Sequence, residues 1–498
     1  MASDRTLGRV IEGVTDRDPG RVAVVIDGTP TTYGELGEAV RNGAAALRSA
    51  GVGPGWRIAL VDDTSLLSVA TLIGATHIGA ATALMNPRLT ADELGVLMKV
   101  AETGSIGVAG ADYADLLRRA GQGVVLGASD LLIDQPRDGV RPREHHPEED
   151  AVVLFTSGTT GTPKAVPLPH AMVASRLSAY SPNVDPVPSV ALMCVPFVHI
   201  GGMLGLMVAL ARGATTVVQT RFDAGEWLAL VERYGVNTCF LVPTMLHRIL
   251  EHPDFATTDL SSLTGLTYGA APASPELIRW ARDALPGVAL ANTFGQTETM
   301  GSITLLGPGD HSAKRLTSVG RPLPGIEVRI VDPVTLEPVP TGVVGELWVK
   351  SDNSVIPDAQ ARDPSIPVGW FRTGDMVSAD DEGYLYPSGR LADTINRGGE
   401  KFSPAEVEAV VRTHPAVRDV AVVGVPDPVM GHRVGVAAVV REPLTADGLR
   451  EFCKGRIANF KIPEYLVVVD EIPYNDFGKV DRKLLRTRFG PESKGEVG

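Results

Sequence analysis

Residues 155–170 read FTSGTTGTPKAVPLPH and follow directly on the apolar run AVVLF (151–155). A buried strand that enters a loop of glycines and hydroxyl side chains, followed by the helical segment HAMVASRLSAY (170–180), is typical of an anion-binding loop. Glycines let backbone N–H groups converge on phosphate oxygens, and Lys164 adds positive charge. The segment is not a Walker A motif, because Thr-Pro separates Gly161 from Lys164. A solvated turn is the alternative, since such clusters are common in loops.

Outward from this segment, short β-branched runs alternate with amphipathic stretches, which predicts an α/β fold. The expected strands are Arg57–Asp62, Val152–Phe155, Thr215–Gln219, Thr238–Val242 and Val288–Asn292, and the expected helices include Tyr33–Ala50 and Glu226–Tyr234.

The pattern changes toward the C-terminus. From Ile326 onward, EVRIVD (327–332) and GELWVK (345–350) predict short strands and turns, with a small barrel over roughly residues 320–390. After Arg390 the sequence predicts helices at Pro404–Thr413 and Ala446–Asn459, with strands Val420–Val425 and Val434–Val440 between them. We therefore expect an N-terminal domain of residues 1–390 and a separate α+β C-terminal domain of residues 391–498.

Composition excludes several classes of function. A chain of 498 residues is too long for one core, so at least two domains are expected. The net charge of −13 argues against non-specific binding to nucleic acid or acidic membranes. No signal peptide and no apolar run of the ~18–20 residues that a membrane span requires is visible. The three isolated cysteines predict a reducing compartment without zinc or disulfides. Together these features predict a cytoplasmic protein.

Eight further motifs follow the opening segment in order. They are PFVHIGG (196–202), TYGAAP (267–272), NTFGQTE (292–298), GELWV (345–349), GWFRTGD (369–375), GYLYPSGR (383–390), NRGGEKFSPAEVE (396–408) and YNDFGKVDRKLL (474–485). With TSGTTGTPK, this series resembles the acyl-adenylating (ANL) superfamily of acyl- and aryl-CoA synthetases, peptide-synthetase adenylation domains and luciferases. The resemblance extends from about residue 29 to residue 485.

The resemblance implies a fold and a reaction. The expected N-terminal domain has two α/β subdomains of sheet and helices plus a small distorted β-barrel, and the C-terminal domain is a small, mobile α+β lid. A carboxylate attacks the α-phosphorus of Mg-ATP, pyrophosphate leaves, and a thiol then attacks the acyl-adenylate. Such a reaction depends mainly on positioning and on neutralising charge.

The resemblance assigns the phosphates to particular residues. The loop for the β- and γ-phosphates would comprise Thr156, Ser157, Gly158, Thr159, Thr160, Gly161 and Lys164. Glu298 matches the magnesium ligand, Thr297 the contact to the α-phosphate, and Lys479 the lysine that bridges the substrate carboxylate and the α-phosphate. Outside the motif, Glu298 would be interpreted as an acid at a helix N-terminus, and Lys479 as an ordinary exposed lysine.

The nucleoside has its own set of candidates. Phe294 stands where the family usually has tyrosine and is expected to stack on adenine. Asp375 matches the ribose-binding carboxylate, with Arg390 beside it, although an aspartate after glycine is more often a turn residue. The remaining expected residues of the adenine pocket are Asn292, Gly269, Ala270, Ala271 and Gly295.

The acyl group is expected among His199, Gly269, Gly295 and Gly301, although His199 also fits a core histidine. Acetate-activating members of the superfamily have tryptophan at the position of Gly295. The glycine therefore predicts an acid larger than acetate: a medium- or long-chain, aryl or polycyclic acid.

For the thiol, Gly398 and Gly399 match the loop that lines the pantetheine tunnel, and Lys401 a basic position near a phosphate group. The hinge near residues 390–393 departs from the family, because Ala392 stands where lysine or aspartate is usual. We expect a carboxylic acid:CoA ligase that uses ATP, Mg²⁺ and coenzyme A. A free-standing enzyme that loads a carrier protein, and a non-enzymatic nucleotide-binding relative, are the alternatives.

Overall fold

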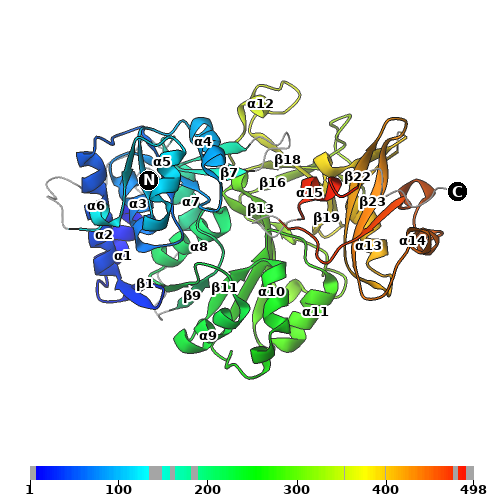
Figure 1. The fold of residues 1–498 in the computed structure, drawn as a ribbon, viewed down its shortest axis with the longest axis horizontal. Coiled ribbons are helices and arrows are strands. Elements are labelled where there is room, and N and C mark those ends of the chain that lie inside the picture. The colour runs from blue at the N-terminus through cyan, green and yellow to red at the C-terminus, as the bar shows by residue number, and fades with distance from the viewer. Residues whose placement is uncertain are drawn as a thin grey trace.

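The computed structural model describes residues 7–133, 148–156, 163–180, 189–352, 354–398, 400–474 and 480–489. Within these ranges the strands form sheets of six, nine, four and five strands. Figure 1 shows the first three sheets and their helices as one large body, with the C-terminal sheet as a smaller unit beside it. The α/β fold with a small C-terminal domain is thus confirmed, whereas the boundary at residues 390 and 391 stays a prediction.

The six-stranded sheet has the order β6-β5-β3-β4-β7-β8 and is parallel except for β8 at its edge. The middle residues of its strands are mostly apolar and buried, because helices cover both faces. Ile58 and Leu60 face α2 and α3, whereas Ala59 and Val61 face α4 and α5. The elements are β3 (Arg57–Val61), β4 (Ala81–Met85), β5 (Ile106–Ala109), β6 (Val124–Leu126), β7 (Asp150–Thr156), β8 (Lys164–Pro169), α1 (Leu7–Thr15), α2 (Tyr33–Ser49), α3 (Leu66–His77), α4 (Ala91–Val100), α5 (Ala114–Arg119) and α6 (Ala128–Leu131).

The nine-stranded sheet has the order β15-β14-β13-β12-β11-β9-β10-β1-β2. Its outer face packs against α9, α10 and α11 through residues such as Trp227 and Tyr268. One continuous core joins α2, α3 and α8 to both large sheets, so these helices lie between the sheets (Figure 1). The elements are β1 (Val22–Ile26), β2 (Thr29–Thr32), β9 (Val190–Met193), β10 (Thr215–Val218), β11 (Thr238–Leu241), β12 (Gly265–Gly269), β13 (Ala289–Gln296), β14 (Gly301–Leu306), β15 (Arg321–Pro322), α7 (His170–Tyr180), α8 (Ile200–Ala211), α9 (Ala224–Tyr234), α10 (Pro243–Glu251) and α11 (Pro275–Ala284).

The region predicted to form a small barrel holds an antiparallel sheet in the order β16-β17-β18-β19. Trp348 and Trp370 are buried in it, and the buried Glu346 pairs with Arg372 at 2.6 Å. The elements are β16 (Glu327–Val331), β17 (Gly345–Lys350), α12 (Asp358–Ala361), β18 (Trp370–Ala379) and β19 (Leu385–Arg390).

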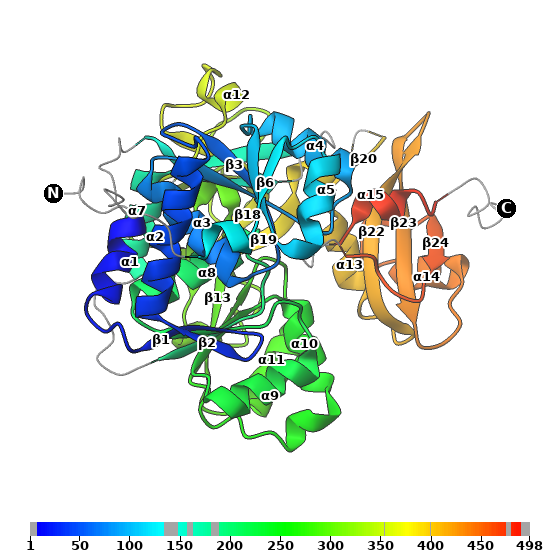
Figure 2. The same ribbon diagram turned by 60° about the vertical axis from the view of Figure 1, so that its left-hand side comes forward.

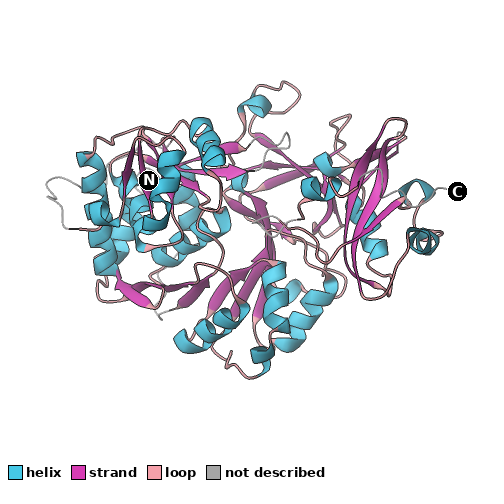
Figure 3. Cartoon of the chain, in the orientation of Figure 1, coloured by secondary structure: helices cyan, strands magenta, loops and turns pink. Residues whose placement is uncertain are grey.

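The C-terminal unit has its own core, which includes Val407, Val422 and Val436, and Figures 2 and 3 show its sheet and helices beside the larger body. The predicted second helix is shorter than expected, because the backbone turns at Lys454 and Gly455 adopts a φ of +72°. The elements are β20 (Ile395–Arg397), β21 (Glu400–Phe402), α13 (Pro404–Val411), β22 (Val417–Asp427), β23 (Gly431–Val440), α14 (Ala446–Cys453), β24 (Tyr465–Val468) and α15 (Arg482–Arg486).

The segment after the opening loop differs from expectation. Lys164–Pro169 forms strand β8, antiparallel to β7, before α7 begins at His170. The loop therefore connects the two strands of a hairpin, whereas the sequence predicted a direct connection from strand to helix. Among the described residues, no helix combines the length and the apolar character that crossing a membrane requires.

Candidate active site

The predicted phosphate loop begins beside the predicted magnesium ligand. Thr156, the last residue of β7, directs its hydroxyl at Oε1 of Glu298, 3.4 Å away. The carbonyl of Glu298 accepts a hydrogen bond of 2.7 Å from the Val355 amide. Lys164 is exposed at the start of β8, whereas Ser157, Gly158, Thr159, Thr160 and Gly161 lie outside the described residues. The structure thus brings the start of the predicted phosphate loop, Thr156, next to the predicted magnesium ligand, Glu298.

Glu298 lies in the 3₁₀ turn Thr297–Thr299, which the neighbouring side chains fix in place. The Thr299 hydroxyl lies 2.8 Å from the Gly301 carbonyl, and Arg176 of α7 donates to the Thr299 carbonyl at 2.7 Å. Arg176 is buried, and the sequence did not single it out, because an arginine in an amphipathic helix is usually exposed. Its guanidinium supports the turn that carries the predicted magnesium ligand.

The predicted ribose residues form one cluster around the buried Asp375, together with a residue that the sequence missed. Asp375 in β18 stands opposite Arg390 in β19, and Arg390 Nε lies 2.9 Å from Asp375 Oδ1. The side-chain amide of Gln296 donates to Asp375 Oδ2 and to the Thr373 carbonyl, the latter at 2.9 Å. Gln296 lies within the NTFGQTE motif, but only the tertiary structure shows that it links this motif to RTGD.

The predicted adenine residues lie at the carboxyl ends of β12 and β13, the usual place for a ligand in an open α/β sheet. A Cβ at Gly269 would lie 2.2 Å from the Thr293 carbonyl oxygen, so this close approach requires glycine. Ala270 adopts a φ of +66°, a left-handed conformation that strains an alanine. Ala271 follows Ala270 in the chain, and Asn292 of β13 stands opposite Tyr268 of β12, just before the turn. Phe294 packs against the four-stranded sheet, and its stacking on adenine stays a prediction.

Gly295 has a backbone role that the sequence did not reveal. A Cβ there would lie 1.9 Å from the Gly301 carbonyl oxygen, because the β13–β14 ladder shifts register between Phe294 and Gly295. Glycine is required by this close approach of two strands, independently of pocket size. The depth of the acyl pocket must therefore be judged from the other walls of the cavity.

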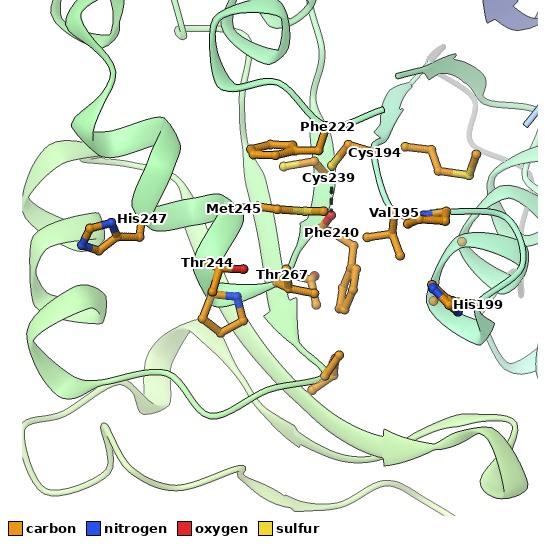
Figure 4. Close-up of a pocket in the computed structure, with 18 of the residues that line it drawn as sticks. Cys194, Val195, His199, Phe222, Cys239, Phe240, Thr244, Met245, His247 and Thr267 are labelled. Carbon is orange, nitrogen blue, oxygen red and sulfur yellow. Dashed lines mark hydrogen bonds between the residues drawn. The ribbon is translucent and has the colours of Figure 1, made fainter. Parts of the chain in front are cut away.

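A cavity of about 1930 Å³ adjoins these residues, and its wall includes Thr297, Gly295, Gly301 and His199. His199 occupies the N-cap position of α8 and is buried. Figure 4 shows His199 and Phe240 of β11 on opposite sides of the same space. Three of the predicted acyl-pocket residues thus line one cavity next to the predicted magnesium ligand.

Two cysteines also border the cavity (Figure 4). Burial raises the pKa of Cys194 to about 12, and it raises the pKa of Cys239 as well. The Cys194 thiol donates to the Phe240 carbonyl at 3.7 Å. Since the thiolate is the reactive form, neither side chain is suited to act as a nucleophile at neutral pH.

On the C-terminal unit, Gly398 has a φ of +62°, and a Cβ there would lie 2.8 Å from the Met430 methyl group. Lys401 belongs to β21, whereas Gly399 and Lys479 lie outside the described residues. Ala392 is exposed in the 3₁₀ turn Leu391–Asp393.

Asp393, next to the predicted hinge residue, approaches Arg482 and Arg486 of α15, each at 3.7 Å. These contacts were not expected from the sequence. They link the predicted hinge to the helix that follows the segment of Lys479.

Known proteins are similar to this chain over almost its whole length. The family model "AMP-binding enzyme" matches residues 11–356, and the model "AMP-binding enzyme C-terminal domain" matches residues 406–479. A feruloyl-CoA synthase from Amycolatopsis is 32% identical over 95% of this chain and 96% of its own. The fatty acid–[acyl-carrier-protein] ligase ScoC from Streptomyces coeruleorubidus is 30% identical over 99% of this chain and 98% of its own.

A solved structure is similar over nearly the whole length. The o-succinylbenzoate CoA synthetase of Bacillus subtilis, in complex with ATP and magnesium ion, superposes with a TM-score of 0.83. It is 27% identical and covers 96% of this chain and 99% of its own.

Proposed function

The chain belongs to the AMP-binding enzyme family, and on that premise we propose that it is an ATP-dependent ligase that joins a carboxylic acid to coenzyme A. The observation that carries this proposal is the convergence of Thr156, Glu298 and the Gln296–Asp375–Arg390 cluster beside one large cavity. Relatives that align over almost the entire chain form CoA thioesters of aryl acids, which supports this choice of reaction.

The residues present fit Mg-ATP. The described residues contain no group of three or more His, Cys, Asp or Glu side chains that could enclose a metal ion by themselves. Mg²⁺ is commonly held by one or two carboxylates together with substrate phosphates, and Glu298 beside the start of the phosphate loop suits that arrangement. Bound magnesium would neutralise charge on the phosphates. The Asp375 carboxylate accepts from Gln296 and pairs with Arg390, and a carboxylate held in this way is an acceptor suited to ribose hydroxyls.

In the first half-reaction, a carboxylate oxygen of the acid forms a bond to the α-phosphorus while the bond to pyrophosphate breaks. Two anions meet in this step, so donors and cations must be fixed in advance. We assign this task to Thr297 and Lys479 at the α-phosphate and to Thr156 through Lys164 at the leaving pyrophosphate.

In the second half-reaction, the thiol sulfur attacks the acyl carbon, AMP leaves with the electron pair of the broken C–O bond, and the thiol proton is released. Gly398, Gly399 and Lys401 are the candidates for the thiol passage. The φ of +62° at Gly398 favours glycine, which keeps this position free of a side chain.

The experiment that tests the proposed function is pyrophosphate release from ATP across a panel of carboxylic acids, with and without CoA. We expect acid-dependent pyrophosphate release and a thioester product only when CoA is present. No pyrophosphate release with any acid would contradict the proposal.

Loading of a carrier protein is the second candidate, and ScoC, which aligns over 99% of this chain, favours it. The two candidates differ only in what carries the thiol. Acyl transfer to a phosphopantetheinylated carrier protein, with no transfer to free CoA at the same concentration, would identify the carrier protein as the thiol acceptor.

A further inference from the structure

The cavity follows one face of α8 from end to end. Its wall includes Ile200, Gly201, Leu204, Gly205, Val208, Ala209 and Arg212. These positions repeat every four residues in adjacent pairs, as one face of a helix does. Arg212 stands twelve positions after Ile200, and at 1.5 Å per residue the face extends about 18 Å.

The opposite wall is the inner face of the nine-stranded sheet. Phe240 of β11 stands opposite Thr267 of β12, and Thr238 of β11, two residues nearer the amino end, stands opposite Ala191 of β9. Figure 4 shows Phe240 and Thr267 side by side in the cavity. From Gly295 the cavity therefore runs past Phe240 to Thr238, away from the phosphate residues.

Open space remains along this path. Gly205 is exposed on α8, and a Cβ there would meet no atom within 4 Å. The space at Gly201 is smaller, since a Cβ added there would lie 3.4 Å from the Phe240 ring. Thr238 is exposed although β11 is a central strand. The glycines of α8 thus widen a passage that side chains would otherwise fill.

The far end of the passage is polar. Thr238, Ser189 and Arg212 belong to the wall there, whereas Leu204, Val208 and Phe240 make its middle apolar. In the part of the chain that the structure describes, the Thr238 hydroxyl makes no hydrogen bond. A hydroxyl facing open space can donate to a ligand oxygen or accept from one.

From these observations we propose that the acid is an elongated molecule with an apolar middle and an oxygen-bearing far end, seated between α8 and β11, with Thr238 and Gly205 determining its specificity. This inference rests on the proposed ligase function. It excludes compact acids such as benzoate as preferred substrates, because they would leave most of the passage empty.

The length of the passage is tested with straight-chain acids from butyrate to dodecanoate, using pyrophosphate release as the readout. The wild type should gain kcat/KM with chain length. Through steric overlap, Gly205→Leu should lower kcat/KM for decanoate roughly ten- to hundredfold more than it lowers kcat/KM for butyrate. Leucine is the better helix former, so the variant is expected to fold. Gly13→Leu is the matched control, since Gly13 is an exposed helical glycine in α1 with open space around it.

The polar end is tested with decanoate against ω-hydroxydecanoate. The wild type should favour the hydroxy acid about fivefold, the value of one net hydrogen bond. Thr238→Val should abolish this preference, so that kcat/KM becomes equal for the two acids. Equal use of both acids by the wild type would overturn the assignment of Thr238.

Different experimental outcomes would overturn the elongated-substrate inference and the proposed ligase function. If benzoate and butyrate release pyrophosphate as well as decanoate does, or if Gly205→Leu keeps the wild-type profile, the elongated-substrate inference is overturned and the ligase function stands. If no acid releases pyrophosphate, the function itself is overturned.

Discussion

Asp62 follows β3 directly and is largely withdrawn from solvent. Burial raises its pKa to about 6 from 3.8, against a hydrogen bond from Ser65 that lowers it, and the charges of Asp63 and Asp112 raise it further. Because the folded protein holds this proton more tightly than the unfolded chain, the stabilising contribution is complete below about pH 3.8 and is lost as the pH rises through about 6.

Asp62→Asn should therefore raise the free energy of unfolding at pH 8 by up to about 3 kcal/mol and change it little at pH 4. Urea unfolding at the two pH values measures the difference. Asp115→Asn, at an exposed carboxylate paired with Arg118, is the control and should stay within a few tenths of a kcal/mol at both. A gain for Asp62→Asn that is equal at both pH values would contradict the protonation argument.

Glu298→Gln keeps the shape of the side chain and removes its charge. An amide oxygen is a weaker ligand than a carboxylate for a hard cation, so the magnesium concentration for half-maximal pyrophosphate release should rise about tenfold or more. Glu327→Gln, at an exposed strand residue paired with Lys350, should leave the titration unchanged. If Glu298→Gln shows the same magnesium dependence as the wild type, the assignment of Glu298 as a magnesium ligand is wrong.

At the scale of elements, the turn after β12 stores strain at Ala270. Since the left-handed conformation disfavours an alanine by about 1–2 kcal/mol, Ala270→Gly should raise the free energy of unfolding by about 0.5–1 kcal/mol once the greater freedom of glycine in the unfolded chain is included. Ala281→Gly in α11, a buried helical site, should lower it by about 1 kcal/mol or more. Thermal unfolding of the two variants would check the opposite signs.

The hairpin β7–β8 shows where element prediction fails. Pro163, Pro167 and Pro169 make residues 163–169 a poor strand by local propensity, because proline cannot donate a ladder hydrogen bond. Strand β8 lies at the edge of its sheet, where one row of backbone groups needs no partner strand. The position of a strand within its sheet is a tertiary property, so local sequence could not supply it.

At the scale of the whole molecule, the two half-reactions are expected to need different placements of the C-terminal unit. Lys479→Ala should abolish acid-dependent pyrophosphate release and largely spare thioester formation from supplied acyl-AMP, because the motif assigns this lysine to adenylation alone. Lys483→Ala, an exposed lysine in α15, should retain both activities. Equal loss of both half-reactions in Lys479→Ala would contradict the assignment of Lys479 to adenylation alone.

The sequence by itself determined the α/β class, the order of the motifs and the family, since hydrophobic periodicity and contiguous motifs are local properties of the chain. It also identified Glu298, Asp375 and Arg390 as candidates. Asp375 and Arg390 lie within separate motifs, so their pairing across β18 and β19 could be expected only by resemblance.

Only the tertiary structure showed that Gln296 and Arg176 support these residues, that Gly295 is required by the approach of Gly301, and that the cavity extends along α8 to Thr238. Each of these features depends on contacts between segments that are brought together by sheet register and helix packing. Such contacts leave no periodic signal in the sequence, because one side chain or one missing Cβ is enough to make them.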